Sequence, residues 1–286
     1  MSGPASTDPD LAYRYCGRLA RQHPENFFIG SLLMPRGKRR HLSAVYAYAR
    51  LADDIADGEL PTEAKLEALD LWERRLDDCL AGRATHPVFV ALARTIPECE
   101  LPVEPLRNLL VAFRSDAAFQ PFLTFADLLG YCRNSANPVG RLVLALFGIR
   151  DEELCRLSDF ICTALQLTNF WQDLGVDLGR GRLYLPLEDL RHFGVDRSAL
   201  ESGRESPELR SCLRFQVDRT RELFRKGLPL AERCPPKVGR EVRMFAEGGL
   251  RILARLEQDG YVPIARRPRL TKGDKVRLLR LGLVGA

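Results

Sequence analysis

Two acidic clusters stand in otherwise apolar stretches of this 286-residue chain. In each cluster two aspartates are four residues apart: Asp53 and Asp57 in the first, Asp173 and Asp177 in the second. Positions i and i+4 lie on one face of an α-helix, so each pair points two carboxylates the same way. Two like charges among apolar side chains are costly unless a cation lies between them. Such oxygen ligands suit Mg²⁺, which completes its shell with water and phosphate oxygens.

The alternative interpretation is a solvated acidic helix face, and for one pair alone it would be the better one. Two pairs favour the metal, because both follow apolar runs, at residues 44–49 and 161–165. A metal bound by two acidic helices could hold a diphosphate and help it leave. The leaving diphosphate carries about three negative charges, which must be neutralised as the C–O bond breaks. Arg50, on the same helical face as Asp53, and Arg182 could add positive charge.

Loss of diphosphate from an allylic or cyclopropylcarbinyl carbon leaves a carbocation. Such a cation needs an apolar cavity lined with aromatic rings rather than a nucleophile. Aromatic residues near the acidic clusters could supply cation–π stabilisation, although each could equally be ordinary core. They are Phe27, Phe28, Tyr46, Tyr48 and Phe170.

Nearly every periodic segment has apolar residues at the three- and four-residue spacing of a helix, and no useful alternating strand pattern occurs. We therefore predict a single all-α domain over residues 1–286, a helical bundle around a central apolar cavity, with residues 1–10 flexible. Thr62 is expected to cap one of the helices. The predicted helices cover 11–20, 38–57, 62–74, 86–95, 103–114, 124–133, 137–147, 151–177, 207–232, 236–258 and 271–281.

Composition narrows the class of protein. With 45% hydrophobic and 28% charged residues, the chain is long enough for one large core. No signal peptide or bilayer-spanning run is visible, so a cytoplasmic protein is expected. The eight scattered cysteines have no zinc-site spacing and are expected to be reduced and mostly buried. A net charge of +5 without a basic, aromatic-interleaved stripe argues against nucleic acid as a partner.

The segment 266–280 carries seven lysines and arginines against one acidic residue, Asp274. This pattern indicates a solvated basic helix near the C-terminus. The other interpretation is peripheral contact with an anionic inner membrane surface, which would suit an enzyme with a lipid product.

Several stretches resemble the squalene/phytoene synthase family of all-α isoprenoid synthases, and the resemblance runs from about residue 11 to 282. The specific stretches are 26–35, 45–57, 131–140 and 165–186, with a weaker one at 251–261. The resemblance implies that both aspartate motifs bind Mg²⁺–diphosphate and that Tyr131 lies in the active site.

The resemblance also implies roles for individual residues. The expected catalytic residues are Tyr131 and the four aspartates Asp53, Asp57, Asp173 and Asp177. Those four and Asn169 are the expected metal ligands. The expected substrate-binding residues are Asn26, Phe27, Tyr46, Arg50, Gln166, Asn169, Gln172 and Arg182.

Two departures from the family pattern point to one branch of it. Most members have Arg immediately before the second aspartate motif, where this chain has Gln172, and Ser-Phe where it has Asn26-Phe27. Both departures resemble the bacterial hydroxysqualene synthases of the HpnC type, in hopanoid biosynthesis. That implies ionisation of presqualene diphosphate and capture of the cation by water, with Mg²⁺ and without NADPH.

The loss of a cation beside the diphosphate also indicates that only one diphosphate is handled. Gln172 or Asn26 could hold the quenching water, or could simply pack. The expected partners are presqualene diphosphate, diphosphate and other enzymes of squalene synthesis.

Two other functions remain open from the sequence. One is condensation of two molecules of a prenyl diphosphate such as farnesyl diphosphate to presqualene diphosphate, squalene or phytoene. The other is a non-catalytic binding or assembly protein of the same fold, which the retention of all four aspartates disfavours. If the protein is an enzyme, the two aspartate pairs should face each other across the cavity, within roughly 12 Å, so that bridging Mg²⁺ ions can join them.

Overall fold

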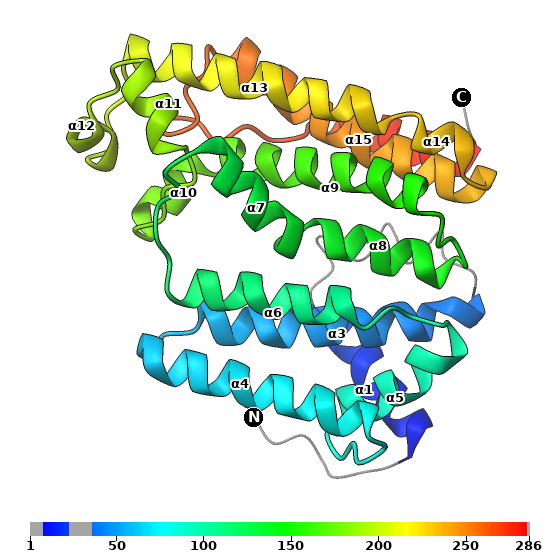
Figure 1. Ribbon diagram of the computed structural model, residues 1–286. Helices are drawn as coiled ribbons and strands as arrows, with labels where there is room; N and C mark the ends of the chain where they lie inside the picture. The colour runs from blue at the N-terminus through cyan, green and yellow to red at the C-terminus, as the bar shows by residue number, and fades with distance from the viewer. Residues whose placement is uncertain (1–7, 23–35, 285–286) are drawn as a thin grey trace. The chain divides into compact units, whose positions relative to one another are not determined.

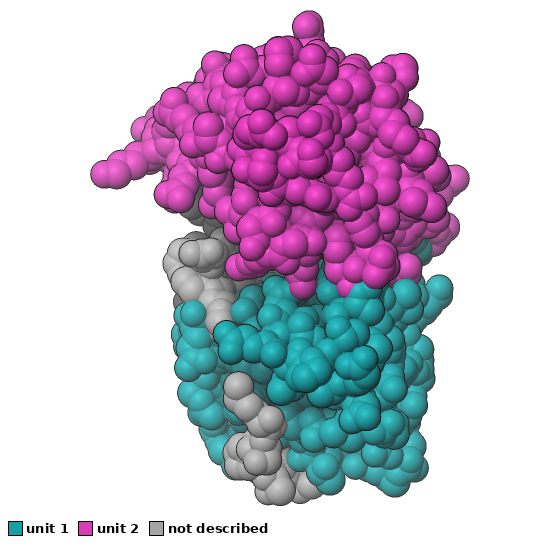
Figure 2. All heavy atoms as spheres, turned by 90° about the vertical axis from the view of Figure 1, so that its left-hand side faces the viewer, with its two compact units in different colours: residues 1–118, 138–151 teal, residues 119–137, 152–286 magenta. Residues whose placement is uncertain are grey.

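The computed structural model describes residues 8–22 and 36–284, and every regular element in those ranges is a helix (Figure 1). The all-α prediction is therefore confirmed. The chain divides into two compact units, residues 1–118 with 138–151 and residues 119–137 with 152–286, coloured separately in Figure 2. Each unit contains its own hydrophobic core. We call them unit 1 and unit 2.

Helix α3 is the central helix of unit 1 and carries the first aspartate motif near its C-terminal end. It packs against α1, α4, α5 and α6. Buried Tyr48 on α3 stacks on Trp72 and donates a 3.0 Å hydrogen bond to the carbonyl of Leu106. The helices are α1 (Pro9–Gln22), α3 (Arg36–Asp57), α4 (Thr62–Leu80), α5 (Pro87–Glu98), α6 (Glu104–Ala117) and α8 (Asn137–Leu146), whose first residue belongs to unit 2.

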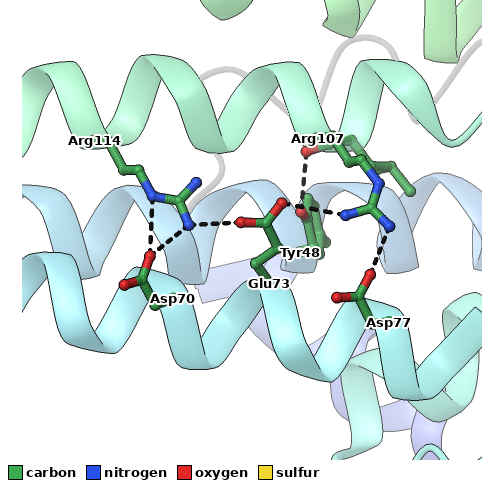
Figure 3. Close-up of polar contacts among 7 residues, drawn as sticks. Tyr48, Asp70, Glu73, Asp77, Arg107 and Arg114 are labelled. Carbon is green, nitrogen blue, oxygen red and sulfur yellow. Dashed lines mark hydrogen bonds and ion pairs between the residues drawn. The ribbon is translucent and has the colours of Figure 1, made fainter.

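A ladder of ion pairs joins α4 to α6 (Figure 3). Arg107 contacts Glu73 at 3.2 Å and Asp77 at 2.5 Å. Arg114 contacts Asp70 and the same Glu73, both at 2.7 Å. These side chains are 27–54% exposed, so each pair adds little stability by itself, about 0–1 kcal/mol.

Helix α9 is the central helix of unit 2 and leads into the second aspartate motif. It packs against α7, α10, α13, α14 and α15. The helices are α7 (Phe125–Ser135), α9 (Glu152–Gln172), α10 (Leu174–Gly179), α11 (Leu187–His192), α12 (Arg197–Glu201), α13 (Pro207–Gly227), α14 (Leu230–Arg233), α15 (Pro236–Gln258) and α16 (Lys272–Val284).

Some boundaries differ from the sequence prediction. The helix expected over 151–177 is interrupted at Asp173, and the one expected over 207–232 is interrupted just before α14, at Pro229, whose missing N–H and fixed φ disfavour an uninterrupted helix. The short helices α11 and α12 were not predicted, because five or six residues carry too little periodicity. Pro9 and Asp10 already belong to α1.

Three further observations concern Thr62, the cysteines and the membrane. Thr62 does not cap α4: Pro61 occupies the N-cap position, and the Thr62 hydroxyl donates to the carbonyl of Ala117 at 3.4 Å. All eight cysteines are free and all but Cys162 are buried, as expected. No helix among residues 8–22 and 36–284 has the length and apolar character needed to cross a bilayer.

Candidate functional site

A stripe of polar side chains runs along one face of α3. Tyr46, Arg50, Asp53 and Asp57 follow one another at steps of four, three and four residues, which is the spacing of a single helix face. The guanidinium of Arg50 contacts Asp53 at 3.4 Å and Asp54 at 2.6 Å. The expected placement of Arg50 beside the first motif is what the structure shows.

The carboxylates of this first motif are more exposed than the sequence argument assumed. The Asp53 side chain is 41% exposed and Asp57 is exposed, whereas their neighbours Ala52 and Ala56 are buried. The cost of burying two like charges is therefore small here and does not by itself require a cation. The donor set still fits Mg²⁺, because carboxylate oxygens accessible from solvent are its preferred protein ligands.

The expected substrate residue Tyr46 is half-buried. Burial raises the pKa of its hydroxyl, while the charge of Arg50 opposes the shift. The hydroxyl therefore stays protonated near neutral pH and can donate a hydrogen bond beside Arg50.

A second polar stripe runs along the end of α9 and into α10. Gln166, Asn169, Asp173 and Asp177 follow at steps of three, four and four residues. The amide of Asp173 donates to the carbonyl of Asn169 at 2.8 Å, and the amide of Asp177 donates to that of Asp173 at 2.9 Å. These two hydrogen bonds bridge the interruption between α9 and α10 at Asp173.

The second motif receives an arginine from a distant part of the chain. Arg267 donates from Nε to Oδ1 of Asp173 and from Nη2 to Oδ2 at 3.0 Å. Next to it, Gln172 donates from Nε2 to the carbonyl of Pro268 at 2.7 Å. Gln172 stands where most members of the resembling family have an arginine, and Arg267 supplies a positive charge to Asp173. That only one diphosphate is handled stays a prediction.

Residues 262–270, which we call the 262–270 loop, are held by further contacts, one of them with α10. The carboxylate of Glu205 accepts hydrogen bonds from the amides of Ile264 and Ala265 at 3.1 and 3.0 Å. At Gly175 of α10, an added Cβ would lie only 3.0 Å from Cα of Ile264. The close approach of the two backbones therefore favours glycine at position 175, since any Cβ there would push Ile264 away.

Tyr131 of α7 lies in an aromatic cluster of unit 2. Its ring centroid is 5.5 Å from that of Phe122, 6.1 Å from Phe170 and 6.2 Å from Tyr184. Phe170 and Tyr184 stack in parallel at 3.8 Å. Because Phe170 immediately follows Asn169 on α9, the cluster places Tyr131 close to the helix that carries the second motif.

The backbone also fixes the segment with Arg182. Its amide donates to the carbonyl of Asp177 at 2.8 Å, in a turn where Gly181 has φ of 72°. That conformation favours glycine. Two residues on, Tyr184 enters the aromatic cluster, so the turn connects the second motif with the aromatic rings.

Some sequence predictions are not placed by these observations. Asn26, Phe27 and Phe28 lie outside the described residues. The two aspartate motifs belong to different units, so their approach to within roughly 12 Å across a cavity stays a prediction. Within residues 8–22 and 36–284, no group of three or more His, Cys, Asp or Glu side chains is close enough to hold a metal.

Two residues of the site were missed by reasoning from sequence. Arg267 was counted only as part of a basic segment, and Glu205 was not singled out at all. The contacts of both depend on how the 262–270 loop packs, and no local spacing reports that.

Comparison with known proteins gives the family. The squalene/phytoene synthase family profile matches residues 20–274. The phytoene synthase of Thermus thermophilus is 34% identical over 100% of this chain and 96% of its own length. The 15-cis-phytoene synthase of Synechocystis sp. is 35% identical over 74% of this chain and 67% of its own.

Two solved structures share the fold along nearly the whole chain. The squalene synthase HpnC of Alicyclobacillus acidocaldarius has a TM-score of 0.84 and 41% identity, covering 90% of this chain and 97% of that one. A dehydrosqualene synthase in complex with ligand has a TM-score of 0.83 and 25% identity, covering 96% and 97%. Profile, identity and fold agree: this chain is an all-α isoprenoid synthase and belongs to the squalene/phytoene synthase family.

Proposed function

We propose that this protein converts presqualene diphosphate to hydroxysqualene in a Mg²⁺-dependent reaction. The carbon–oxygen bond to diphosphate breaks, and the electron pair leaves with diphosphate. The cyclopropylcarbinyl cation rearranges, a water oxygen adds to it, and a proton is lost to solvent. The observation that carries the proposal is the 41% identity to the squalene synthase HpnC over nearly the full length of both chains.

Both polar stripes support the binding of a metal–diphosphate group. The residues that would hold Mg²⁺ are Asp53, Asp57, Asn169, Asp173 and Asp177. When bound, the metal supplies positive charge to the leaving diphosphate. On unit 1, Arg50 adds a guanidinium to the same face, and Tyr46 adds a protonated hydroxyl. On unit 2, Gln166 and Arg182 complete the polar set, and Asn26, Phe27 and Gln172 are proposed as further contacts to the substrate.

The aromatic cluster of unit 2 supports a carbocation mechanism. The rings of Tyr131, Phe122, Phe170 and Tyr184 give an electron-rich apolar surface beside the second motif. Aromatic faces stabilise a positive charge without reacting with it. Tyr131 also carries a hydroxyl, so we propose it as the catalytic residue that contacts the diphosphate or the reacting carbons.

The position of the quenching water is less well supported at Gln172. Its Nε2 already donates to the carbonyl of Pro268, which leaves only its Oε1 for a water. Any contact of Gln172 with the substrate or with the quenching water would therefore be made by Oε1.

Condensation of two prenyl diphosphates is the second candidate function. The curated relatives named phytoene synthase, such as that of Thermus thermophilus at 34% identity, favour it. A binding or assembly role without catalysis is the weakest candidate, because all four motif aspartates are present.

The function is tested by incubating the protein with presqualene diphosphate and Mg²⁺ in ¹⁸O-labelled water without NADPH. We expect release of diphosphate and an alcohol that carries the label. An unlabelled product, or a hydrocarbon formed only when NADPH is added, would identify a reductive squalene synthase. Presqualene diphosphate as the main product from farnesyl diphosphate would identify the condensing enzyme. Protein with Asp53→Asn and Asp177→Asn combined serves as the control.

We also propose a cytoplasmic location, the two units acting as one catalytic domain, and weak contact with an anionic membrane. Exposed basic side chains of α16, Lys272, Lys275, Arg277 and Arg280, support the contact. Such binding would place the enzyme near its lipid product and near enzymes that supply its substrate. Flotation with vesicles of phosphatidylglycerol should recover the protein at low salt and lose it at high salt. Equal recovery with neutral vesicles would contradict an electrostatic contact.

A further inference from the structure

Arg267 binds the two carboxylate oxygens of Asp173, which are the atoms proposed to coordinate Mg²⁺. Arg267 uses two donors, Nε and Nη2, on the two oxygens of one carboxylate. The Asp173 side chain is 28% exposed and that of Arg267 is 41% exposed. A two-point arginine–carboxylate pair of this kind is stronger and more directional than a single ion pair.

The arginine is brought to the carboxylate by contacts that do not involve the ion pair. Gln172 holds the carbonyl of Pro268, the residue after Arg267. Glu205 holds the amides of Ile264 and Ala265, and Ile264 lies against Gly175. The loop is therefore fixed on both sides of Arg267, and the guanidinium loses little freedom when it pairs with Asp173.

A guanidinium bound to both oxygens of a carboxylate occupies one lone pair of each, and its positive charge repels a metal ion that approaches the remaining lone pairs. We infer that Arg267 is a positioning residue that competes with the divalent metal for Asp173 and weakens the binding of metal alone. The inference rests on the proposed role of Asp173 as a metal ligand. It gives the second motif a resident counter-charge before the metal arrives. The motif then favours a metal that comes with an anion, since the anion can pair with the displaced guanidinium.

The test is the affinity of the intact protein for Mn²⁺ alone, measured by electron paramagnetic resonance at low ionic strength. Arg267→Gln should bind Mn²⁺ about three- to tenfold more tightly than the unaltered protein, which is the range of a half-exposed two-point ion pair. Arg267→Lys should lie between the two, because an ammonium is a point charge and does not match both oxygens. The matched control is Arg269→Gln, which removes the same charge from an exposed side chain of the same loop. It should stay within about twofold.

Asp173→Asn separates failure of this inference from failure of the proposed function. If Asp173→Asn weakens Mn²⁺ binding and Arg267→Gln leaves it unchanged or weaker, Arg267 does not compete and the inference is overturned. If Asp173→Asn leaves Mn²⁺ binding unchanged, Asp173 is not a ligand. The metal assignment in the proposed function then fails, and the inference fails with it.

Thermal unfolding gives a second readout that does not depend on activity. A ligand that binds only the folded state raises Tm by an amount that grows with its affinity. Mg²⁺ should therefore raise the Tm of Arg267→Gln more than it raises that of the unaltered protein. An equal rise in both proteins would contradict the competition.

Discussion

The two aspartate motifs have the same spacing but obtain their positive charge in different ways. On α3, Arg50 and Asp53 are three residues apart on one helix, so the pair forms whenever the helix forms. On α9 and α10, the arginine that meets Asp173 lies 94 residues further along the chain. The first pair is a local property of the sequence, and the second is a property of tertiary structure.

The two motifs also differ in helix continuity and in the exposure of their aspartates. Helix α3 continues without interruption through Asp57, whereas the second motif contains a break at Asp173. The Asp53 side chain is 41% exposed against 28% for Asp173. The second motif is therefore the one whose geometry responds to changes elsewhere in the fold.

The largest expected effect tests whether the two motifs serve one reaction. Asp53→Asn and Asp177→Asn should each lower turnover of presqualene diphosphate on the order of a hundredfold or more, because each removes the charge of a proposed metal ligand. The Tm of either variant should change little, since Asp53 is half-exposed and only weakly paired.

The matched control for these variants is Asp70→Asn. Asp70 is an exposed aspartate of unit 1 that pairs with Arg114 away from the motif, and its loss should leave turnover unchanged. Normal turnover with unchanged Mg²⁺ dependence in either motif variant would show that the two motifs do not serve one reaction.

The next effect concerns the aromatic cluster beside the second motif. Tyr131→Phe should lower turnover by about tenfold or more while Tm changes little, because the ring keeps its packing against Phe122 and Phe170. Tyr184→Phe, in the same cluster, is the comparison variant. Equal losses in both variants would mean that the cluster and not the Tyr131 hydroxyl carries the effect.

A smaller effect should reach the second motif through α16. Asp274 accepts hydrogen bonds from the amide and hydroxyl of Thr271 at 2.9 and 2.7 Å, and from Arg251 and Arg255 at 2.8 and 3.4 Å. Asp274→Asn should lower Tm by about 2–6 °C, since it weakens both the helix cap and two charged contacts. It should also change Mn²⁺ affinity, if the loop before α16 loosens.

The Tm difference between Asp274→Asn and the unaltered protein should depend on pH. The hydrogen bonds from Thr271, and then those from Arg251 and Arg255, hold the pKa of the Asp274 carboxyl below its usual range. The carboxylate therefore stabilises the folded protein above about pH 4, and this stabilisation is lost as the pH falls through the lower folded-state pKa. The difference in Tm between the two proteins should narrow below pH 4. A constant difference down to pH 2 would exclude the carboxylate as its source.

The smallest effect is expected far from either motif. Glu73→Gln removes the carboxylate shared by Arg107 and Arg114 in Figure 3. The loss should be about 1 kcal/mol or less, because these pairs are partly exposed, and it should vanish at high salt. Turnover measured beside Tm checks it: lower turnover in Glu73→Gln would show that the α4–α6 contact shapes the first motif after all.

Sequence reasoning went furthest where the signal was local. The i, i+4 spacing placed Asp53 and Asp57 on one helix face and Arg50 beside them, because helix geometry alone determines those neighbours. The partner of Asp173 could not be obtained in this way. It depends on a loop whose path is determined by Glu205 and by a close contact at Gly175, and no periodic pattern encodes either.

Sequence reasoning also did not predict that the aspartates of the first motif are exposed. Apolar neighbours such as Ala52 and Ala56 indicated a buried helix, and those two alanines are buried. The aspartates lie on the other face, and composition in a window does not resolve the two faces of one helix.

The path of the chain through the two units sets an order for folding during synthesis. Helix α7 belongs to unit 2 yet is made before α8, which completes the core of unit 1 through Leu142 and Leu146. The core of unit 1 is therefore complete only once Leu146 has been made, and α7 packs against α9, which is made later. We expect unit 1 to fold before unit 2, because the arginine partner of the second motif lies as far along the chain as residue 267.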